Sequence, residues 1–161
     1  EPYRLAEALN RHTIPGVIFR EAYFEPAFNK WTGEICGGLQ LHVVRPEIYR
    51  PLFTTIAIVR EVMNLYPDRE PLHANVLDAP HSGSRPTETS GALGSARAGQ
   101  WAWKQPPYEY EYQKLPVDII LGGDGIRHLL EEGASAKEIE ASWIEEQEDF
   151  QRLKASFHLY T

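Results

Sequence analysis

GEICGGLQLHV, residues 33–43, is the stretch that decides the fold of this chain. Three glycines surround Cys36, and the segment Leu39–Val43 then alternates apolar and polar side chains. Alternation with a period of two is typical of a strand that has one buried face. The stretch therefore predicts a glycine-rich loop that leads into a half-buried strand, with Gln40 and His42 on the face opposite its apolar side chains.

The segments on either side of this stretch have equally clear patterns. Residues 17–24 are rich in β-branched and aromatic side chains and are soon followed by Pro26, which predicts a strand. Residues 3–10 and 51–66 carry apolar side chains every three or four positions, which predicts two helices. A proline begins the second of these helices, and Pro67 prevents its continuation.

The second half of the chain begins with a change of composition. Small, polar and proline residues dominate positions 68–100, which predicts a long irregular loop or an insertion. Residues 101–103 and 108–112 alternate like strands, and residues 117–121 form a short apolar run that predicts another strand. We expect a helix from Asp124 to Glu132 after that run.

The C-terminal segment predicts one long amphipathic helix. Ser135 and Glu138 have the spacing of a capping box, and one apolar stripe follows them over about five turns. This stripe is expected to face the core, and its members are Ile139, Trp143, Phe150, Leu153 and Phe157. Residues 1–161 thus predict a single α+β domain, a small mixed sheet packed against about four helices with a long irregular loop in the middle.

Composition and charge exclude several classes of protein. The net charge is −7, from 23 acidic and 16 basic residues, so we expect no nucleic-acid partner. No apolar run approaches the roughly 20 residues of a membrane span, and residues 1–4 do not begin a signal peptide, so we expect a soluble piece and no membrane partner. Cys36 is a single cysteine and excludes an internal disulfide.

Metal ligands are sparse in this sequence. His73, Asp78 and His81 offer suitable atoms, but their spacing matches no established zinc pattern. We therefore expect no metal and no cofactor. Cys36 lacks a base close to it in the sequence, so a small buried side chain is favoured over a nucleophile.

FEPAFNKWTGEICGGLQLHV, residues 24–43, resembles the C-terminal domain of the exo-β-N-acetylmuramidase family, whose members are bacterial. The specific elements are its Phe, Pro, Lys, Gly and Cys in order, followed by an apolar–polar–apolar–His strand. The resemblance extends to most of the chain outside the segment 68–100. The further matching segments are residues 50–51, 65–67, 107–111, 115–118 and 143–160.

This resemblance implies one half of a two-domain glycoside hydrolase. The family has an N-terminal Rossmann-like domain, and the substrate cleft lies between the two domains. The family releases N-acetylmuramic acid from the non-reducing ends of peptidoglycan fragments during cell-wall recycling, which implies an exported protein, periplasmic or extracellular. The acidic cluster associated with catalysis belongs to the N-terminal domain, so we assign no catalytic residue here and expect the isolated chain to be inactive.

Candidate substrate-binding groups come from two segments. Lys30 would pair with the lactyl carboxylate of muramic acid, or be an ordinary surface lysine. Gln40 and His42 would bond sugar hydroxyls or an acetamido group, or be structural polar groups. Peptidoglycan-derived saccharides are thus the expected ligands.

The Tyr-Glu repeat offers a pair of carboxylates. On one face of a strand Glu109 and Glu111 would lie roughly 6 to 7 Å apart, within the separation of about 5 to 10 Å that glycosidases use. A solvated sheet face explains the same alternation, and Glu109, next to Tyr108, is the better candidate. Trp101, Trp103 and Tyr108 would stack on sugar rings or pack in the core.

Three hypotheses remain open at this level. The first is the substrate-side domain of the muramidase. The second is a non-catalytic carbohydrate-binding or protein-interaction module, and the third is hydrolysis by Glu109 and Glu111 unaided. An apolar surface left uncovered on the isolated domain would also serve as a homodimer interface.

Overall fold

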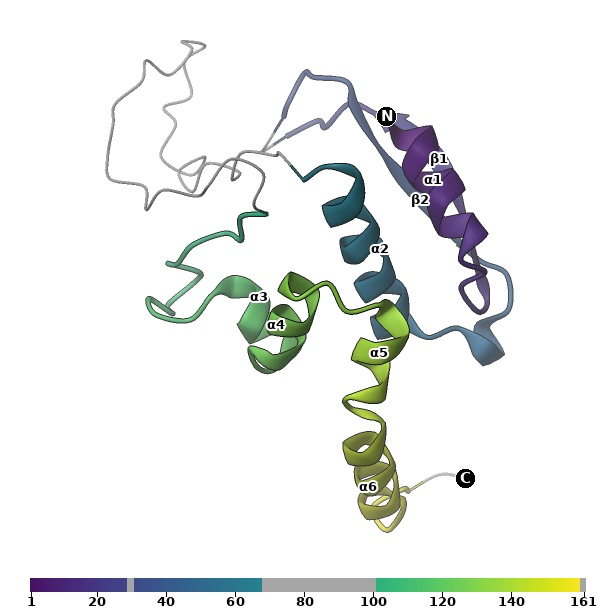
Figure 1. The fold of residues 1–161 in the computed structure, drawn as a ribbon, viewed down its shortest axis with the longest axis vertical. Helices are drawn as coiled ribbons and strands as arrows, with labels where there is room; N and C mark the ends of the chain where they lie inside the picture. The colour runs from purple at the N-terminus through teal and green to yellow at the C-terminus, as the bar shows by residue number, and fades with distance from the viewer. Residues whose placement is uncertain (29–30, 68–100, 160–161) are drawn as a thin grey trace.

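We analysed a computed structural model of the chain, which describes residues 1–28, 31–67 and 101–159. Their elements follow one another as a helix, a strand pair and a series of further helices (Figure 1). In chain order these are α1 (Pro2–Arg11), β1 (Val17–Phe24), β2 (Cys36–Val43), the short 3-10 helix η1 (Pro46–Ile48), α2 (Pro51–Leu65), α3 (Pro116–Leu121), α4 (Gly125–Glu131), α5 (Ala136–Ala141) and α6 (Ile144–Ala155).

The sheet of the described residues is an antiparallel pair, β1 and β2. Its register runs from Val17 opposite Val43 to Phe24 opposite Cys36. This confirms both predicted strands and the α+β class, although the pair is antiparallel where a mixed sheet was expected. β2 begins at Cys36, so two of the glycines lie inside the strand instead of in a loop before it.

Helix α1 covers one face of this sheet. Leu5 and Leu9 of α1 and Val17 and Phe19 of β1 are buried in one cluster, and each such side chain contributes about 1.5–3 kcal/mol. Gly37 allows the close approach of the helix, because a Cβ there would lie 2.5 Å from the side chain of Pro2. Any larger residue at this position would push α1 away from the sheet.

Helix α2 lies between the two halves of the molecule (Figure 1). Phe53 and Ala57 belong to the cluster with α1 and the sheet, whereas Ile56 packs with Leu130 and Ile139 of the C-terminal helices. Two buried stripes on one helix therefore join the two halves, which explains the strongly apolar sequence of α2.

Three strands predicted for the second half of the chain are wrong. Residues 116–121 form the helix α3, with Pro116 in its first turn and Gly122 at φ +83° after its last residue. Residues 101–103 form no strand, and residues 108–111 form a tight turn with an isolated bridge between Tyr108 and Glu111. A short apolar run fits a strand and a helix equally well, and Ile119 and Ile120 of α3 are 39% and 70% exposed, so this run is not the buried strand that was expected.

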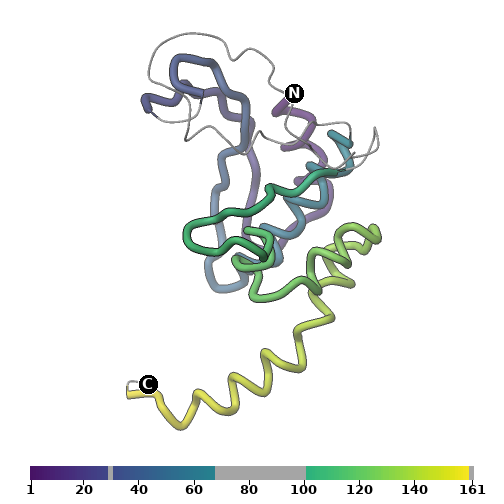
Figure 2. Tube along the Cα trace, turned by 90° about the vertical axis from the view of Figure 1, so that its left-hand side faces the viewer, coloured from purple at the N-terminus to yellow at the C-terminus, as the bar shows by residue number. Residues whose placement is uncertain are grey.

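The predicted long C-terminal helix is divided into α5 and α6. Ile139 of α5 is fully buried, but Phe150, Leu153 and Phe157 are 60%, 63% and 73% exposed. The second half of the expected core stripe is therefore not core, and α6 extends away from the rest of the molecule (Figure 2). No helix among the described residues is long and apolar enough to cross a membrane.

Candidate functional site

The first group of predicted residues lies on the face of the sheet opposite α1. Gln40 pairs with Arg20 and His42 pairs with Ile18 in the register, so all four side chains share that face. Gln40 is exposed, and the buried Nε2 of His42 has no hydrogen-bond partner within the described residues. A buried imidazole nitrogen is normally paired, so this face has unused hydrogen-bonding capacity.

Two other residues of this motif have different outcomes. Lys30 lies outside the described residues, so its predicted role stays a prediction. Cys36 is half-buried at the start of β2, opposite Phe24.

The second group lies in the turn of residues 108–111. Tyr108 N–H donates to the carbonyl of Glu111 at 2.9 Å, and Glu111 N–H donates back to the carbonyl of Tyr108 at 3.0 Å. Glu109 occupies the left-handed region at φ +56°, which is uncommon for a residue other than glycine. Glu109 and Glu111 are therefore not a same-face pair on a strand, and the separation expected for two glycosidase carboxylates does not apply to them.

The two carboxylates of this turn differ in their contacts. Glu111 accepts hydrogen bonds from the backbone N–H of Gln113 at 2.7 Å and of Lys114 at 3.2 Å. These two bonds, that of Gln113 first, lower the pKa of Glu111 below its ordinary value. Glu109 is exposed and, within the described parts of the chain, makes no hydrogen bond or ion pair, so it is free to contact a ligand.

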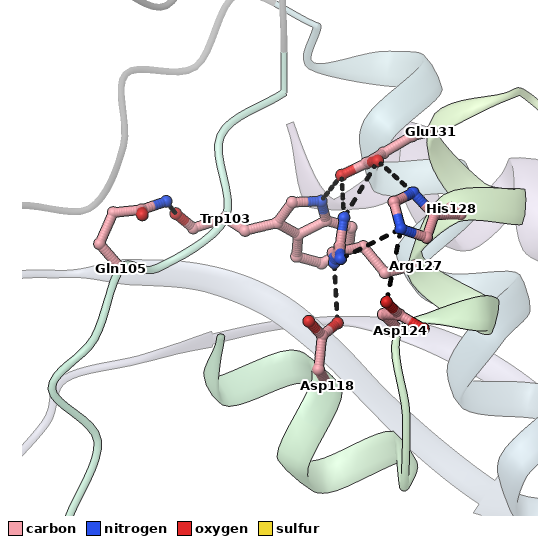
Figure 3. Close-up of polar contacts among 7 residues, drawn as sticks. All are labelled: Trp103, Gln105, Asp118, Asp124, Arg127, His128 and Glu131. Atoms are coloured by element: carbon pink, nitrogen blue, oxygen red, sulfur yellow. Dashed lines mark hydrogen bonds and ion pairs between the residues drawn. The ribbon is translucent and has the colours of Figure 1, made fainter. Parts of the chain in front are cut away.

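A third cluster, which the sequence did not predict, surrounds Arg127 (Figure 3). Its Nε donates to Asp118 Oδ1 at 2.7 Å, and its Nη1 lies 3.3 Å from both carboxylate oxygens of Glu131. The Trp103 indole N–H donates to Glu131 at 2.8 Å. The side chains of Arg127 and Asp118 are each 13% exposed, and their hydrogen bond is the main cause that raises the pKa of Arg127.

His128 extends this Arg127 cluster at its exposed edge. Its Nε2 accepts from Arg127 at 3.4 Å and lies 3.7 Å from Asp124, and its Nδ1 lies 3.5 Å from Glu131. The carboxylates of Asp118 and Glu131 are occupied by Arg127, and the side chain of Asp118 is only 13% exposed, so they are poorly placed to contact a substrate. The cluster therefore holds α3, α4 and the segment around Trp103 together instead of forming a reaction centre.

The spacing of Arg127 and Glu131 on one helix could have suggested their pair from the sequence. The bonds to Trp103 and Asp118 could not be foreseen, since they depend on how α3 and the segment before it pack against α4.

The aromatic side chains that were predicted to stack on sugar rings mostly pack against other residues of the chain. Trp103 packs on the core of Ile56, Leu130 and Ile139, which favours the core-packing alternative. The ring of Trp101 packs edge to face against the ring of Trp103, with 5.8 Å between the ring centroids. The Lys104 Nζ lies over the ring of Tyr108, 5.3 Å from its centroid.

The contacts of the described residues do not connect the two groups of predicted residues. Within the described ranges, no hydrogen bond, ion pair or ring contact links Gln40 or His42 to Tyr108 or Glu109. A shallow hollow among the described residues is lined by Glu1, Arg4, Leu65 and Tyr66, and none of the predicted residues lines it. No cluster of three potential metal ligands occurs in the described part of the chain, and His73, Asp78 and His81 lie outside it.

Comparison with known proteins decides the family. The profile described as "Exo-beta-N-acetylmuramidase NamZ, C-terminal" matches residues 1–160. The chain belongs to this family. The resemblance of residues 24–43 is thereby confirmed over nearly the whole sequence.

Two similar proteins show the extent of the match. The peptidoglycan β-N-acetylmuramidase NamZ of Bacillus subtilis (strain 168) is 38% identical over 64 residues, which are 40% of this chain and 16% of that protein. The crystal structure of a DUF1343 family protein from Bacteroides fragilis NCTC 9343 matches with a TM-score of 0.67 at 24% identity. The match covers 100% of this chain and 33% of the Bacteroides fragilis chain. The present chain therefore spans about a third of the length of that solved structure.

Proposed function

We propose that this chain is the substrate-side domain of a glycoside hydrolase that releases N-acetylmuramic acid from the non-reducing ends of peptidoglycan fragments. The match of the NamZ C-terminal profile to residues 1–160 carries this proposal. A catalytic N-terminal domain, Rossmann-like by the family resemblance, would form the other wall of the cleft. The same resemblance supports an exported location, periplasmic or extracellular, and a role in peptidoglycan recycling.

The free groups of this chain suit binding better than hydrolysis. Asp118 and Glu131 are paired with Arg127, and Glu111 is bound by backbone N–H groups, which supports inactivity of the isolated chain. Glu109 combines a free carboxylate with an unusual backbone conformation. Backbone outliers of this kind cluster at binding and catalytic sites.

Each proposed contact has a distinct chemical role. Glu109 accepts hydrogen bonds from sugar hydroxyls. Gln40 and His42 bond the acetamido group, and Lys30 pairs with the lactyl carboxylate. Tyr108 supports the turn beneath Lys104.

Two measurements on the chain test this function. A chromogenic N-acetylmuramic acid glycoside is expected to show no turnover with the chain alone. The disaccharide of N-acetylmuramic acid and N-acetylglucosamine, added during an NMR titration, is expected to shift the signals of Gln40, His42 and Glu109. Turnover abolished by Glu109→Gln would overturn the inactivity of the chain, and a titration without shifts would overturn the binding role.

The exposed stripe of α6 favours a second candidate, a protein-interaction module without saccharide binding. A homodimer through that stripe is one form of this candidate. Light scattering distinguishes the two functions, because a module of this kind would associate through α6 and ignore the disaccharide. The substitution Phe150→Ser would then abolish association and leave the titration unchanged.

A further inference from the structure

The outer edge of β1, the side that faces away from β2, is partly closed. The Asn10 side chain on α1 donates to the carbonyl of Phe19 at 2.8 Å and accepts from its N–H at 3.0 Å. β1 also carries the charged residues Arg20 and Glu21. Occupied backbone groups and charges both discourage another strand from pairing at an edge.

The same bonds show which backbone groups of β2 point away from β1. Phe19 lies opposite Leu41, and its backbone groups bond Asn10, so Phe19 and Leu41 are a non-hydrogen-bonded pair. Hydrogen-bonded and non-hydrogen-bonded pairs alternate along an antiparallel ladder. The hydrogen bond from Val44 N–H to the Gly16 carbonyl, at 2.9 Å, has the phase that this alternation requires. The outward-pointing backbone groups at the centre of β2 are therefore those of Leu39, Leu41 and Val43.

The outer edge of β2 is open, in contrast to that of β1. Among the described residues, no hydrogen bond occupies these outward backbone groups. Leu41 and Val43 are 41% and 45% exposed, and β2 contains no acidic residue, lysine, arginine or proline. A strand edge with unpaired backbone groups and no such charge is a template for a further strand.

We propose that this edge pairs with the same edge of a second copy of the chain, in an antiparallel arrangement about a two-fold axis at Leu41. Leu41 then lies opposite its own equivalent, and Leu39 lies opposite Val43 of the second copy. On the other face of the sheet, Gln40 lies opposite His42 of the second copy. Each outward pair exchanges two N–H···O bonds, so the groups left unpaired at the centre of β2 are paired in the dimer.

The side chains at this edge suit pairing with a copy of themselves. Leu39, Leu41 and Val43 share the face of the sheet on which α1 lies, so the pairing joins them into one apolar row across the axis. On the opposite face, the amide of Gln40 and the imidazole of His42 can hydrogen-bond each other. No two like charges of β2 meet across the axis, although the chain has a net charge of −7.

The difference between the two edges also limits the size of the assembly. A two-fold contact between equal edges uses the open edge of both copies at once, so the assembly is closed. Further copies would have to add at the outer edge of β1, where Asn10 occupies the backbone groups of Phe19. The pairing therefore ends at two copies and produces no filament.

Light scattering over a range of concentrations tests the pairing on the unmodified chain, whose mass is expected to double as the concentration rises. Leu41→Pro removes an outward N–H but no bond to β1, and is expected to return the mass to that of one chain. Glu21→Pro is the matched control. It also removes an outward N–H, because Glu21 lies opposite Leu39, but it does so at the edge of β1 and is expected to leave the doubled mass unchanged.

Amide hydrogen exchange locates the contact without any substitution. The N–H groups of Leu39, Leu41 and Val43 are expected to be protected at high concentration and to lose this protection on dilution. The N–H groups of Gln40 and His42 face β1, so their protection is expected to persist on dilution. Exchange at the three outward groups that does not depend on concentration would contradict the pairing.

Two results of the scattering experiment would overturn the proposal. One is a mass of one chain at every concentration up to roughly 1 mM. The other is a doubled mass that is lost in Phe150→Ser but not in Leu41→Pro, because the copies would then meet through α6. If Leu41→Pro loses the dispersed amide spectrum of a folded chain, Leu41→Lys takes its place, since two lysines facing each other across the axis are expected to separate the copies. The substrate-side function is tested separately, by saccharide binding.

Discussion

Helices α5 and α6 continue one amphipathic pattern but lie in opposite environments. Ile139 of α5 is fully buried with Ile56 and Leu130, whereas Phe150 and Leu153 of α6 are 60% and 63% exposed. A periodic apolar stripe therefore identifies the face of a helix that is suited to burial. It does not say whether another element of the same chain covers that face.

The two helices also differ in what stabilises them. Helix α5 has both hydrogen bonds of a capping box and a buried side chain. Helix α6 has 12 residues and mainly local contributions, with Glu145 and Glu146 in its first turn and Arg152 and Lys154 in its last. An isolated helix of this length is marginal in water, so α6 depends on these charges and on its attachment to α5.

The sharpest test of this comparison removes one apolar side chain from each helix. Ile139→Ala is expected to lower the free energy of unfolding by about 2–5 kcal/mol, because it leaves a cavity in a closed core. Phe150→Ala is expected to change it by less than about 0.5 kcal/mol. Urea denaturation measures both, and a loss at Phe150 equal to that at Ile139 would mean that the α6 stripe is covered in solution.

The second test concerns the polar contacts that hold α3 and α4 together. Arg127→Met removes the charged hydrogen bonds to Asp118 and Glu131. It is expected to lower the free energy of unfolding by about 2 kcal/mol. The indole N–H signal of Trp103 should shift as well, since its partner Glu131 is released. Arg152→Met on α6 is the control, because its partner Asp149 is exposed and such surface pairs contribute little. If Arg127→Met and Arg152→Met lowered the free energy of unfolding equally, the expected difference between the α3–α4 contacts and α6 would be contradicted.

A smaller effect is expected at the start of α5. Ser135→Ala removes the hydroxyl that accepts from Glu138 N–H and is expected to cost about 1 kcal/mol. Ser156→Ala, at the C-terminal end of α6, is the matched control and removes no N-cap. A change of thermal stability no larger than that of the control would show that the capping box is not formed in solution.

The smallest effect is a dependence of α5 on pH. The hydrogen bond from Ser135 N–H, with a further contribution from the Ser135 hydroxyl, lowers the pKa of Glu138 from 4.5. Because the pKa of Glu138 is lower in the folded state, its stabilisation of the folded state is fully present above pH 4.5. This stabilisation is lost as the pH falls through the folded pKa. An NMR titration should give a low pKa for Glu138 that rises only partly in Ser135→Ala, since the backbone bond remains. A pKa unchanged from 4.5 in the unmodified chain would contradict the capping geometry.

Local patterns were sufficient where neighbouring residues determine the outcome. Residues 17–24 were predicted as a strand with the observed bounds, and residues 51–66 as a helix that ends at Leu65. The family was also recognisable from residues 24–43, and the profile match confirmed it. Of the predicted site, Gln40 and His42 do share a face, because alternation along a strand is a local property.

The periodicity of the sequence did not decide the rest. Residues 116–121 form a helix instead of a strand, and Glu109 lies in a turn and shares no strand face with Glu111. The partners of Arg127 come from two helices and from the segment of Trp103, so no single stretch of sequence contained that cluster. The sequence by itself determined the periodicity of each segment and the family of the chain. Only the folded structure decided which apolar faces are covered and which charges are paired, because burial and ion pairing depend on residues that are distant in the chain and meet only on folding.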